Sequence, residues 1–311
     1  SYSQEKYLTR KQKKFARRFT VDELTPNAML EYLYHDKEPL KIMGLSIESL
    51  GMIMSLGNVM PGGDYLVMDE TGGLIVFAML ERMDGKGSIT LIHENDQPSL
   101  HLLTMTRWAD LELLEEVLHP INVLQFLHKS TERPEFTVLA DQELKKMPEI
   151  KQTQYMRKLK RFNSINIAMD KVLQNSFDAL IYVSTLNPTT FVPQIIPRLS
   201  GSTPIVVYSL YKEVLVDLNH ALLRDKRVLL PNIHHTAVRK YQTIPGKIHP
   251  LMTSRPPAGF ILMGITVFPL ENAQATGRFT NKKRKVETPT VTDKTGDECS
   301  EKPEETLEIA V

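Results

Sequence analysis

The chain has little of what marks extracellular, metal-binding or membrane proteins. Among its 311 residues there is one cysteine, Cys299, which excludes an internal disulfide framework and any metal site that needs several thiolates. No uninterrupted apolar run approaches the roughly 20 residues of a membrane span, so we expect no membrane association. Charged residues make up 24% of the chain and the net charge is +1. With so small a net charge, only the distribution of charge along the chain is informative.

The chain does contain an alternation of apolar strands and helices. Strands are predicted at residues 64–69, 88–94, 177–184, 203–209, 227–231, 238–245 and 259–268. Helices are predicted at residues 46–60, 72–83, 99–108, 111–128, 151–175, 190–199 and 210–226. Strands that alternate with helices of this length pair in parallel through right-handed crossovers. The sequence therefore predicts an α/β fold with a doubly wound, mostly parallel sheet.

Changes in composition predict how the chain is divided. Residues 1–39 are predicted to form a basic N-terminal helix and a linker, and residues 40–270 the doubly wound domain. Residues 129–150 lack clear periodicity and contain two prolines, which indicates a connector or an insertion within that domain. Residues 271–311 hold a basic cluster followed by a mainly acidic stretch with almost no aromatic residues. Such a composition is typical of a disordered tail.

The turn after the first predicted strand lacks the glycine spacing of a nucleotide-binding site. In a doubly wound enzyme this turn needs glycines, because the backbone must approach the ligand closely. Here Gly72 and Gly73 follow two carboxylates, Asp69 and Glu70, and no G-x-G spacing is present. We therefore interpret the segment as a degenerate cofactor turn. The alternative is a working pocket, in which Glu94, at the end of the second strand, would hold ribose hydroxyls.

The loop after the third predicted strand offers no general base. It holds Ser184, Thr185 and Asn187, none of which is basic at neutral pH without an activating partner. A hydrolase would need a histidine beside Ser184, and no G-x-S-x-G elbow surrounds that serine. The adjacent His234 and His235 cannot point to the same side of a strand, which disfavours a metal site.

Positive charge is concentrated in two segments. The first is a predicted amphipathic helix at residues 5–18, with Lys6, Arg10, Lys11, Lys13, Lys14, Arg17 and Arg18. The second opens the predicted helix at 151–175 and has Lys151, Arg157, Lys158, Lys160 and Arg161, without an acidic residue between them. Clustered Lys and Arg bind the phosphates of structured RNA, although a solvated helix face has the same composition. Tyr155 and Phe162 lie within the second segment and are candidates to stack on an unpaired base.

A short basic cluster, NKKRKV, lies in the predicted tail. Its cations are Lys282, Lys283, Arg284 and Lys285. Clusters of this kind act as nuclear localisation signals, although they also occur by chance. Alone, this cluster is weak evidence, and only together with the family resemblance given below does it lead us to expect a nuclear protein.

Three segments of the chain resemble one protein family: EKYLTRKQKKFARRFTV, PGGDYLVMDETGGLIVFAMLERM and YQTIPGKIHPLMTSRPPAGFILMGITV. They are similar to the non-catalytic subunits of the eukaryotic tRNA (adenine-58, N1)-methyltransferase. The resemblance covers nearly the whole of residues 5–268. The D-E-T-G-G-L and G-K-x-H-P-L-M segments are far more specific than the fold pattern.

The resemblance implies a class I methyltransferase-like fold without a working cofactor site. Catalytic relatives bind S-adenosylmethionine through a glycine-rich turn and place an Asp at the start of a later loop. This chain has MDETGGL and VSTLNP there, with Ser184 where the Asp would stand, so we expect no cofactor in it. The resemblance also implies a catalytic partner that carries S-adenosylmethionine, a dimer of heterodimers, and a surface for tRNA. Family members usually have an additional N-terminal β-rich domain, which we expect to be missing from this chain.

We therefore expect a non-catalytic subunit that binds and positions tRNA and supports the catalytic subunit. Two alternatives stay open: an RNA methyltransferase that is active on its own with S-adenosylmethionine, and a scaffold without RNA contact. The strongly apolar stretches 43–56 and 111–127 indicate either core or subunit interface. We expect an interface for part of this surface, and the strand at 259–268 is a candidate to pair across it.

Overall fold

The computed structural model of the chain describes residues 2–17, 19, 21–36, 39–109, 111–128, 136–137, 139, 144, 147–174, 177–252 and 259–270. The chain divides into two compact units, residues 1–269 and 270–311, and all but one of the described residues belong to the first. Most of the predicted connector at 129–150 lies outside the described residues. The predicted tail also lies outside them, together with its basic cluster at Lys282, Lys283, Arg284 and Lys285.

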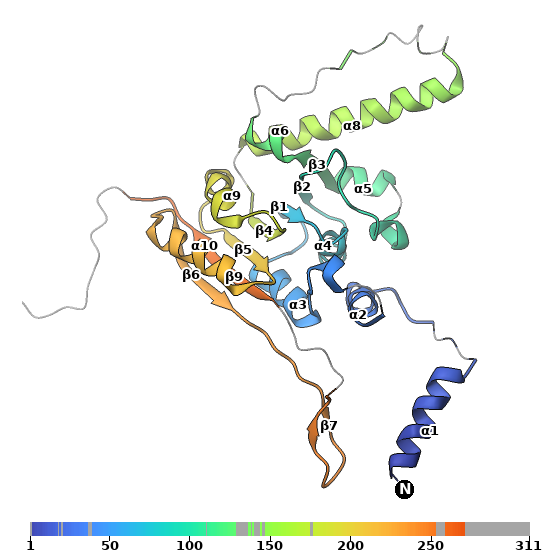
Figure 1. Cartoon of the computed structure of the whole chain (residues 1–311). Coiled ribbons are helices and arrows are strands. Elements are labelled where there is room, and N and C mark those ends of the chain that lie inside the picture. Colours follow the sequence, from blue (N-terminus) through green and yellow to red (C-terminus); the bar gives the residue numbers. More distant parts are fainter. Residues whose placement is uncertain are drawn as a thin grey trace, which may run out of the picture. The chain divides into compact units, whose positions relative to one another are not determined.

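The centre of the first unit is a seven-stranded sheet in the order β3-β2-β1-β4-β5-β9-β6 (Figure 1). Its strands are β1 Asp64–Asp69, β2 Ser88–His93, β3 Leu118–Asn122, β4 Ala179–Val183, β5 Pro204–Ser209, β6 Val228–His234 and β9 Phe260–Thr266. The first five strands pair in parallel, and β9 runs antiparallel between β5 and β6. Two short strands, β7 Tyr241–Gln242 and β8 His249–Pro250, pair separately. The sheet confirms the predicted doubly wound, mostly parallel α/β fold of the class I methyltransferase-like type.

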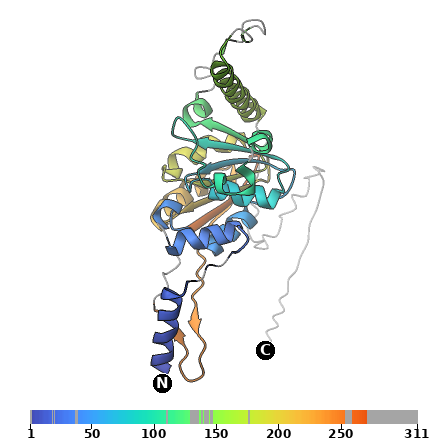
Figure 2. The same ribbon diagram turned by 90° about the vertical axis from the view of Figure 1, so that its right-hand side faces the viewer.

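Helices cover both faces of this sheet, as Figures 1 and 2 show. The α-helices are α1 Tyr2–Phe15, α2 Pro26–Asp36, α3 Ile47–Leu56, α4 Leu74–Met83, α5 Leu111–Val117, α6 Val123–Leu127, α8 Glu149–Gln174, α9 Pro188–Ile195 and α10 Lys212–Arg224. The 3-10 helices are η1 Pro39–Ile42, η2 Leu103–Met105, η3 Arg107–Ala109 and η4 Ile196–Arg198. Side chains alternate between the faces of a strand. Tyr65 and Val67 of β1 accordingly join one hydrophobic cluster with α2, α3 and α4, whereas Leu66 and Met68 join another with α8, α9 and α10.

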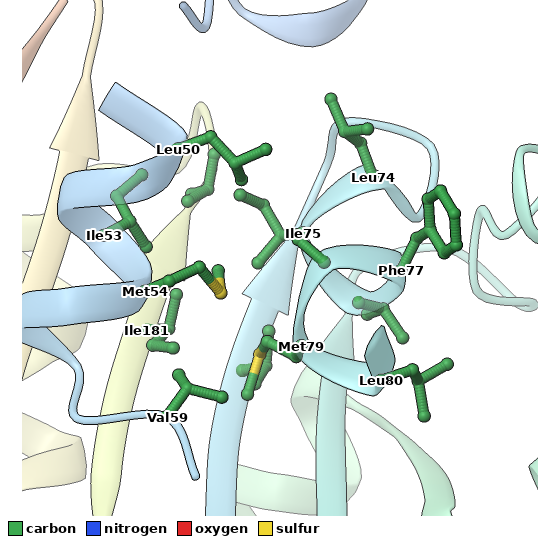
Figure 3. Close-up of a cluster of buried hydrophobic side chains, with 14 of the residues drawn as sticks. Leu50, Ile53, Met54, Val59, Leu74, Ile75, Phe77, Met79, Leu80 and Ile181 are labelled. Atoms are coloured by element: carbon green, nitrogen blue, oxygen red, sulfur yellow. The ribbon is translucent and has the colours of Figure 1, made fainter. Parts of the chain in front are cut away.

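Figure 3 shows part of the first cluster, in which Leu50, Ile53 and Met54 of α3 lie near Ile75 and Met79 of α4. α4 is buried from its first residue through Leu80, so its apolar sequence belongs to the core. Among the described residues, one segment, 39–56, reaches the length and mean hydropathy (1.2) of a membrane span. This segment is broken between η1 and α3, and most of its apolar side chains lie in the same core.

Two predicted helices are wrong. Residues 99–108 form η2 and the start of η3 instead of an α-helix, and hydroxyls bond the local backbone there: Thr106 Oγ1 donates to the carbonyl of Leu103 at 2.8 Å. Residues 111–128 contain α5, then β3, then α6. Pro120 in this stretch disfavours a continuous helix but is compatible with β3, because β3 is an edge strand that pairs with β2 alone.

The strand predicted at 259–268 does not have a free edge. As β9 it pairs with β5 on one side and with β6 on the other. The expectation that it pairs across a subunit interface is therefore wrong, because both of its hydrogen-bonding edges are used inside the sheet.

Candidate functional site

The predicted degenerate turn joins β1 to α4 at the carboxyl edge of the parallel strands. From β1 the chain proceeds to β2 and β3 on one side of the sheet and then returns to β4 on the other. Doubly wound proteins bind their ligands where the strand order reverses in this way. Asp69 pairs in register with Val183, so the turn lies beside the loop that begins at Ser184. The structure thus brings together the two segments that the sequence singled out.

Asp69 is directed inward and caps α4. Its side chain is buried, with 6% exposed. Oδ1 accepts hydrogen bonds from the backbone N and the hydroxyl of Thr71 at 2.7 and 2.5 Å, and Oδ2 accepts one from the backbone N of Val76 at 3.1 Å. Burial raises the pKa of the Asp69 carboxyl above 3.8, while hydrogen bonds from Thr71 and Val76 oppose the rise. The N–H group of Val76, in the first turn of α4, is therefore bound to Asp69, where a helix N-terminus could otherwise bind an anion.

Glu70 joins the ends of β1 and β4. Its Oε1 accepts a hydrogen bond from the Ser184 hydroxyl at 2.6 Å, and its Oε2 accepts two from the backbone N and hydroxyl of Thr185, each at 2.8 Å. Hydrogen bonds to an ionised carboxylate are among the stronger ones in proteins. The Ser184 hydroxyl also accepts from the backbone N of Leu186 at 3.0 Å. Ser184 is thereby used to close the loop and is not arranged as a nucleophile. We refer to the bonds of Glu70 with Ser184 and Thr185 as the Glu70 clamp.

The two glycines of the turn are explained by packing within the chain. Gly72 and Gly73 have φ angles of +79° and +96°, in the left-handed region that favours glycine. A Cβ atom on Gly72 would clash with Cε1 of His101. The backbone N of Leu102 donates to the carbonyl of Gly72 at 3.1 Å. The backbone that approaches a ligand in a cofactor-binding enzyme is covered here by residues that follow β2.

His101 is a part of this site that sequence reasoning missed. It lies 29 positions beyond Gly72 in a stretch predicted as a helix, and no motif links the two residues. Glu94, which the alternative reading needs as a ribose ligand, is exposed just after β2. Among the described residues, no group of three or more His, Cys, Asp or Glu side chains is placed to hold a metal ion.

The first predicted RNA-binding segment forms α1 and the residues just after it. Its described cations are all exposed: Lys6, Arg10, Lys11, Lys14 and Arg17. The ammonium of Lys11 lies 5.4 Å from the ring centroid of Tyr7 and 5.3 Å from that of Phe15. Arg18 and the side chain of Lys13 lie outside the described part of the chain. α1 thus presents cations and aromatic rings to solvent together.

The second predicted segment lies in the N-terminal half of α8, which extends past the sheet in Figure 1. The buried residues of α8 are Ala168, Met169 and Val172, all in its other half. Lys151, Arg157 and Lys158 are exposed. Lys160 forms an ion pair with Glu115 of α5 at 3.0 Å, and Arg161 Nη2 donates to the carbonyl of Asp96 at 2.6 Å. All five cations are exposed, and two of them, Lys160 and Arg161, also contact the domain.

The aromatic residues of α8 have an internal partner. The ring of Phe136 lies 5.4 Å from that of Tyr155 and 5.3 Å from that of Phe162, stacked on the latter. The Tyr155 hydroxyl also accepts a hydrogen bond from the backbone N of Leu139 at 3.0 Å. Both rings therefore contact the connector in this structure, and their stacking on an unpaired base stays a prediction.

Comparison with known proteins shows the family of the chain. The Gcd10p family model matches residues 1–151. The tRNA (adenine(58)-N(1))-methyltransferase non-catalytic subunit of Schizosaccharomyces pombe is 31% identical, over 93% of this chain and 70% of its own length. The chain belongs to the Gcd10p family. Proteins of the same name from Debaryomyces hansenii and Eremothecium gossypii are 44% and 42% identical, over 91% and 87% of this chain. Those matches cover 60% and 61% of the relatives, so the chain spans about three fifths of their length.

Solved structures similar to this Gcd10p-family chain include two methyltransferases. One is a SAM-dependent O-methyltransferase from Thermotoga maritima, with a TM-score of 0.48 and 11% identity over 73% of this chain and 68% of that one. The other is the tRNA (m1A58) methyltransferase TrmI from Aquifex aeolicus, with a TM-score of 0.48 and 12% identity over 79% of this chain and 77% of that one.

Proposed function

We propose that this chain is the non-catalytic subunit of a tRNA adenine-N1 methyltransferase complex. It binds and positions tRNA and supports a catalytic subunit that carries S-adenosylmethionine. The observation that carries the proposal is the Glu70 clamp, which joins the cofactor turn to the loop after β4. The names of the relatives, which describe non-catalytic subunits, support it.

A methyl donor would meet three obstacles at this turn. The helix N–H group of Val76 is already bound to Asp69, and His101 covers Gly72. Glu70 bonds Ser184 and Thr185 and so joins the cofactor turn to the loop after β4. These contacts within the chain therefore disfavour binding of S-adenosylmethionine at the turn.

The contribution to tRNA binding comes from the two basic helices. Lys and Arg on exposed surfaces bind phosphates without strict sequence requirements, which suits recognition of a folded RNA by its shape. The exposed cations Lys151, Arg157 and Lys158 lie on the half of α8 that has no buried residue. α1 offers a second group. These cations do not stabilise the core, so they are available to a polyanion.

The partner and the location follow from the same proposal. The donor must reside in a second, catalytic chain, and the complex is a dimer of such heterodimers. The cluster Lys282–Lys285, outside the described residues, directs the protein to the nucleus. Fluorescence microscopy of the chain with these four residues changed to Ala tests the location, and loss of nuclear enrichment is expected.

Reconstitution with the catalytic subunit tests the function. Methyl transfer to tRNA is measured for this chain alone, for the catalytic subunit alone and for the co-expressed complex. Full transfer is expected only for the complex. Transfer by this chain alone would establish the alternative of an independent methyltransferase. A further variant changes Lys6, Arg10, Lys14 and Arg17 of the first segment to Glu, and the exposed cations Lys151, Arg157 and Lys158 of α8 as well. If its affinity for tRNA is unchanged, the chain is a scaffold without RNA contact.

A further inference from the structure

A groove lies between the basic half of α8 and the edge of the domain. Its cavity volume is about 280 Å³. The floor is apolar and consists of Pro98, Leu100, Leu114, Leu118 and Pro120. Gln97 and Ser164 add an amide and a hydroxyl to the lining. The volume is close to the lower limit of about 300 Å³ for small-molecule sites, so the groove has room for a group about the size of one base.

The rim of the groove is cationic. Arg157, Lys160 and Arg161 line it together with one carboxylate, Glu115, which leaves a net charge of +2 (three cations less one anion). The ion pair of Lys160 with Glu115 and the bond from Arg161 to the carbonyl of Asp96 hold two of these cations in place. Arg157 is exposed and takes part in no ion pair among the described residues. The rim is therefore both positive and partly preorganised.

A second hollow adjoins the first. It has a volume of about 260 Å³ and shares Pro98, Pro120 and Arg161 with the groove. His93, Asp96, Asn122 and Gln125 give it a mostly polar lining. Arg161 thus stands between two small cavities, the first with an apolar floor and the second more polar. A repeated unit of ring and phosphate, as in a nucleotide chain, matches this arrangement better than a single extended apolar ligand does.

We propose that the groove binds an unpaired nucleotide of the tRNA. The base lies on the leucine and proline floor, and its phosphate contacts Arg157 and Lys160. Duplex RNA offers phosphates but no free base face, so exposed cations alone would serve it and the apolar floor would add nothing. Single-stranded RNA offers both. This inference rests on the proposed function, because it locates one contact within the tRNA-binding surface.

Filling the groove without changing its charge tests the inference. Ser164→Phe places a ring in the groove, and Asn163→Phe places the same ring on an exposed neighbouring position of α8 that does not line it. The complex with the catalytic subunit is titrated with fluorescent tRNA over a range of salt concentrations. Ser164→Phe is expected to weaken binding about tenfold, the size of one lost base contact, with an unchanged salt slope. Asn163→Phe is expected to bind as the wild type does.

A second pair of variants, each of which loses one positive charge, keeps the test decisive if Ser164→Phe does not fold. Arg157→Gln and Lys212→Gln remove the same charge from exposed positions, of which Arg157 lines the groove and Lys212, in α10, does not. Cross-linking of 4-thiouridine-containing tRNA to groove residues is expected in the wild type and reduced in Arg157→Gln alone. The inference is overturned if, in both pairs of variants, the groove variant and its control bind and cross-link tRNA equally. Weaker association with the catalytic subunit at unchanged tRNA affinity would instead assign the groove to a protein segment. Absence of any tRNA binding by the wild-type complex would refute the proposed function itself.

Discussion

Two neighbouring carboxylates in the turn have different structural roles. Asp69 is buried and accepts hydrogen bonds within its own turn and helix. Glu70 reaches across the sheet edge to residues about 115 positions later in the chain. The sequence placed both carboxylates in the degenerate turn but could not predict their partners, because Ser184 and Thr185 come close only through the pairing of β1 with β4.

The Glu70 clamp is expected to contribute measurably to stability. Glu70→Ala leaves the buried Ser184 hydroxyl and the Thr185 backbone N without their acceptor. Loss of such hydrogen bonds should lower the free energy of unfolding by roughly 1–3 kcal/mol. Urea denaturation provides the measurement. The matched control is Glu94→Ala, an exposed residue for which a change within about 0.5 kcal/mol is expected. If Glu70→Ala and Glu94→Ala changed the free energy of unfolding equally, the stabilising role of the Glu70 clamp would be contradicted.

The raised pKa of Asp69 predicts how stability depends on pH. A carboxyl whose pKa is higher in the folded state stabilises the fold fully below its unfolded pKa, and this contribution is lost as the pH rises through the folded pKa. The difference in free energy of unfolding, wild type minus Asp69→Asn, should therefore fall as the pH rises from below 3.8 and then level off. The Asn variant does not titrate, so its lost hydrogen bonds add only a constant. Urea denaturation across this pH range tests the sign, and a rising difference would show that Asp69 is not desolvated.

At the scale of elements, the buried strands and long helices were the most predictable part. β1 was predicted at its observed bounds, and α8 and α10 within two residues of theirs, because continuous apolar runs and clear periodicity identify them. β3 was missed inside an apolar stretch, since a short apolar run fits a strand or a helix equally well. The contact of Phe136 with α8 was also missed, as nothing in the sequence places an irregular connector against a helix.

The exposed cations of α8 predict a change in the salt dependence of tRNA binding. Changing Lys151, Arg157 and Lys158 to Gln should weaken binding and reduce the slope of log K against log salt. The reduction is about 0.7–0.9 per lost phosphate contact, or about two to three in total. The matched control removes three exposed cations at the end of the domain away from α8: Lys212, Arg224 and Lys226. If both triple variants lower the slope equally, the change seen for α8 reflects the net charge of the protein and not contacts between α8 and tRNA phosphates.

At the scale of the whole molecule, a net charge of +1 conceals a strong separation of charge. Cations gather on α1 and on one half of α8, whereas the cofactor turn holds two carboxylates. The family could be recognised from sequence segments, because they are specific over nearly the whole domain. The filled turn could be predicted only from the absence of the G-x-G spacing. What fills it, the Glu70 clamp and His101, required the fold.

Calorimetric titration of this chain alone with S-adenosylmethionine tests the central claim most directly. The account predicts no heat of binding for the isolated chain, because its turn is bonded to Asp69, Glu70 and residues of the same chain. The same titration of the complex with the catalytic subunit should give saturable binding at one site per catalytic chain. Saturable binding by the isolated chain, lost on changing Glu94 to Ala, would contradict the account and establish a working cofactor pocket.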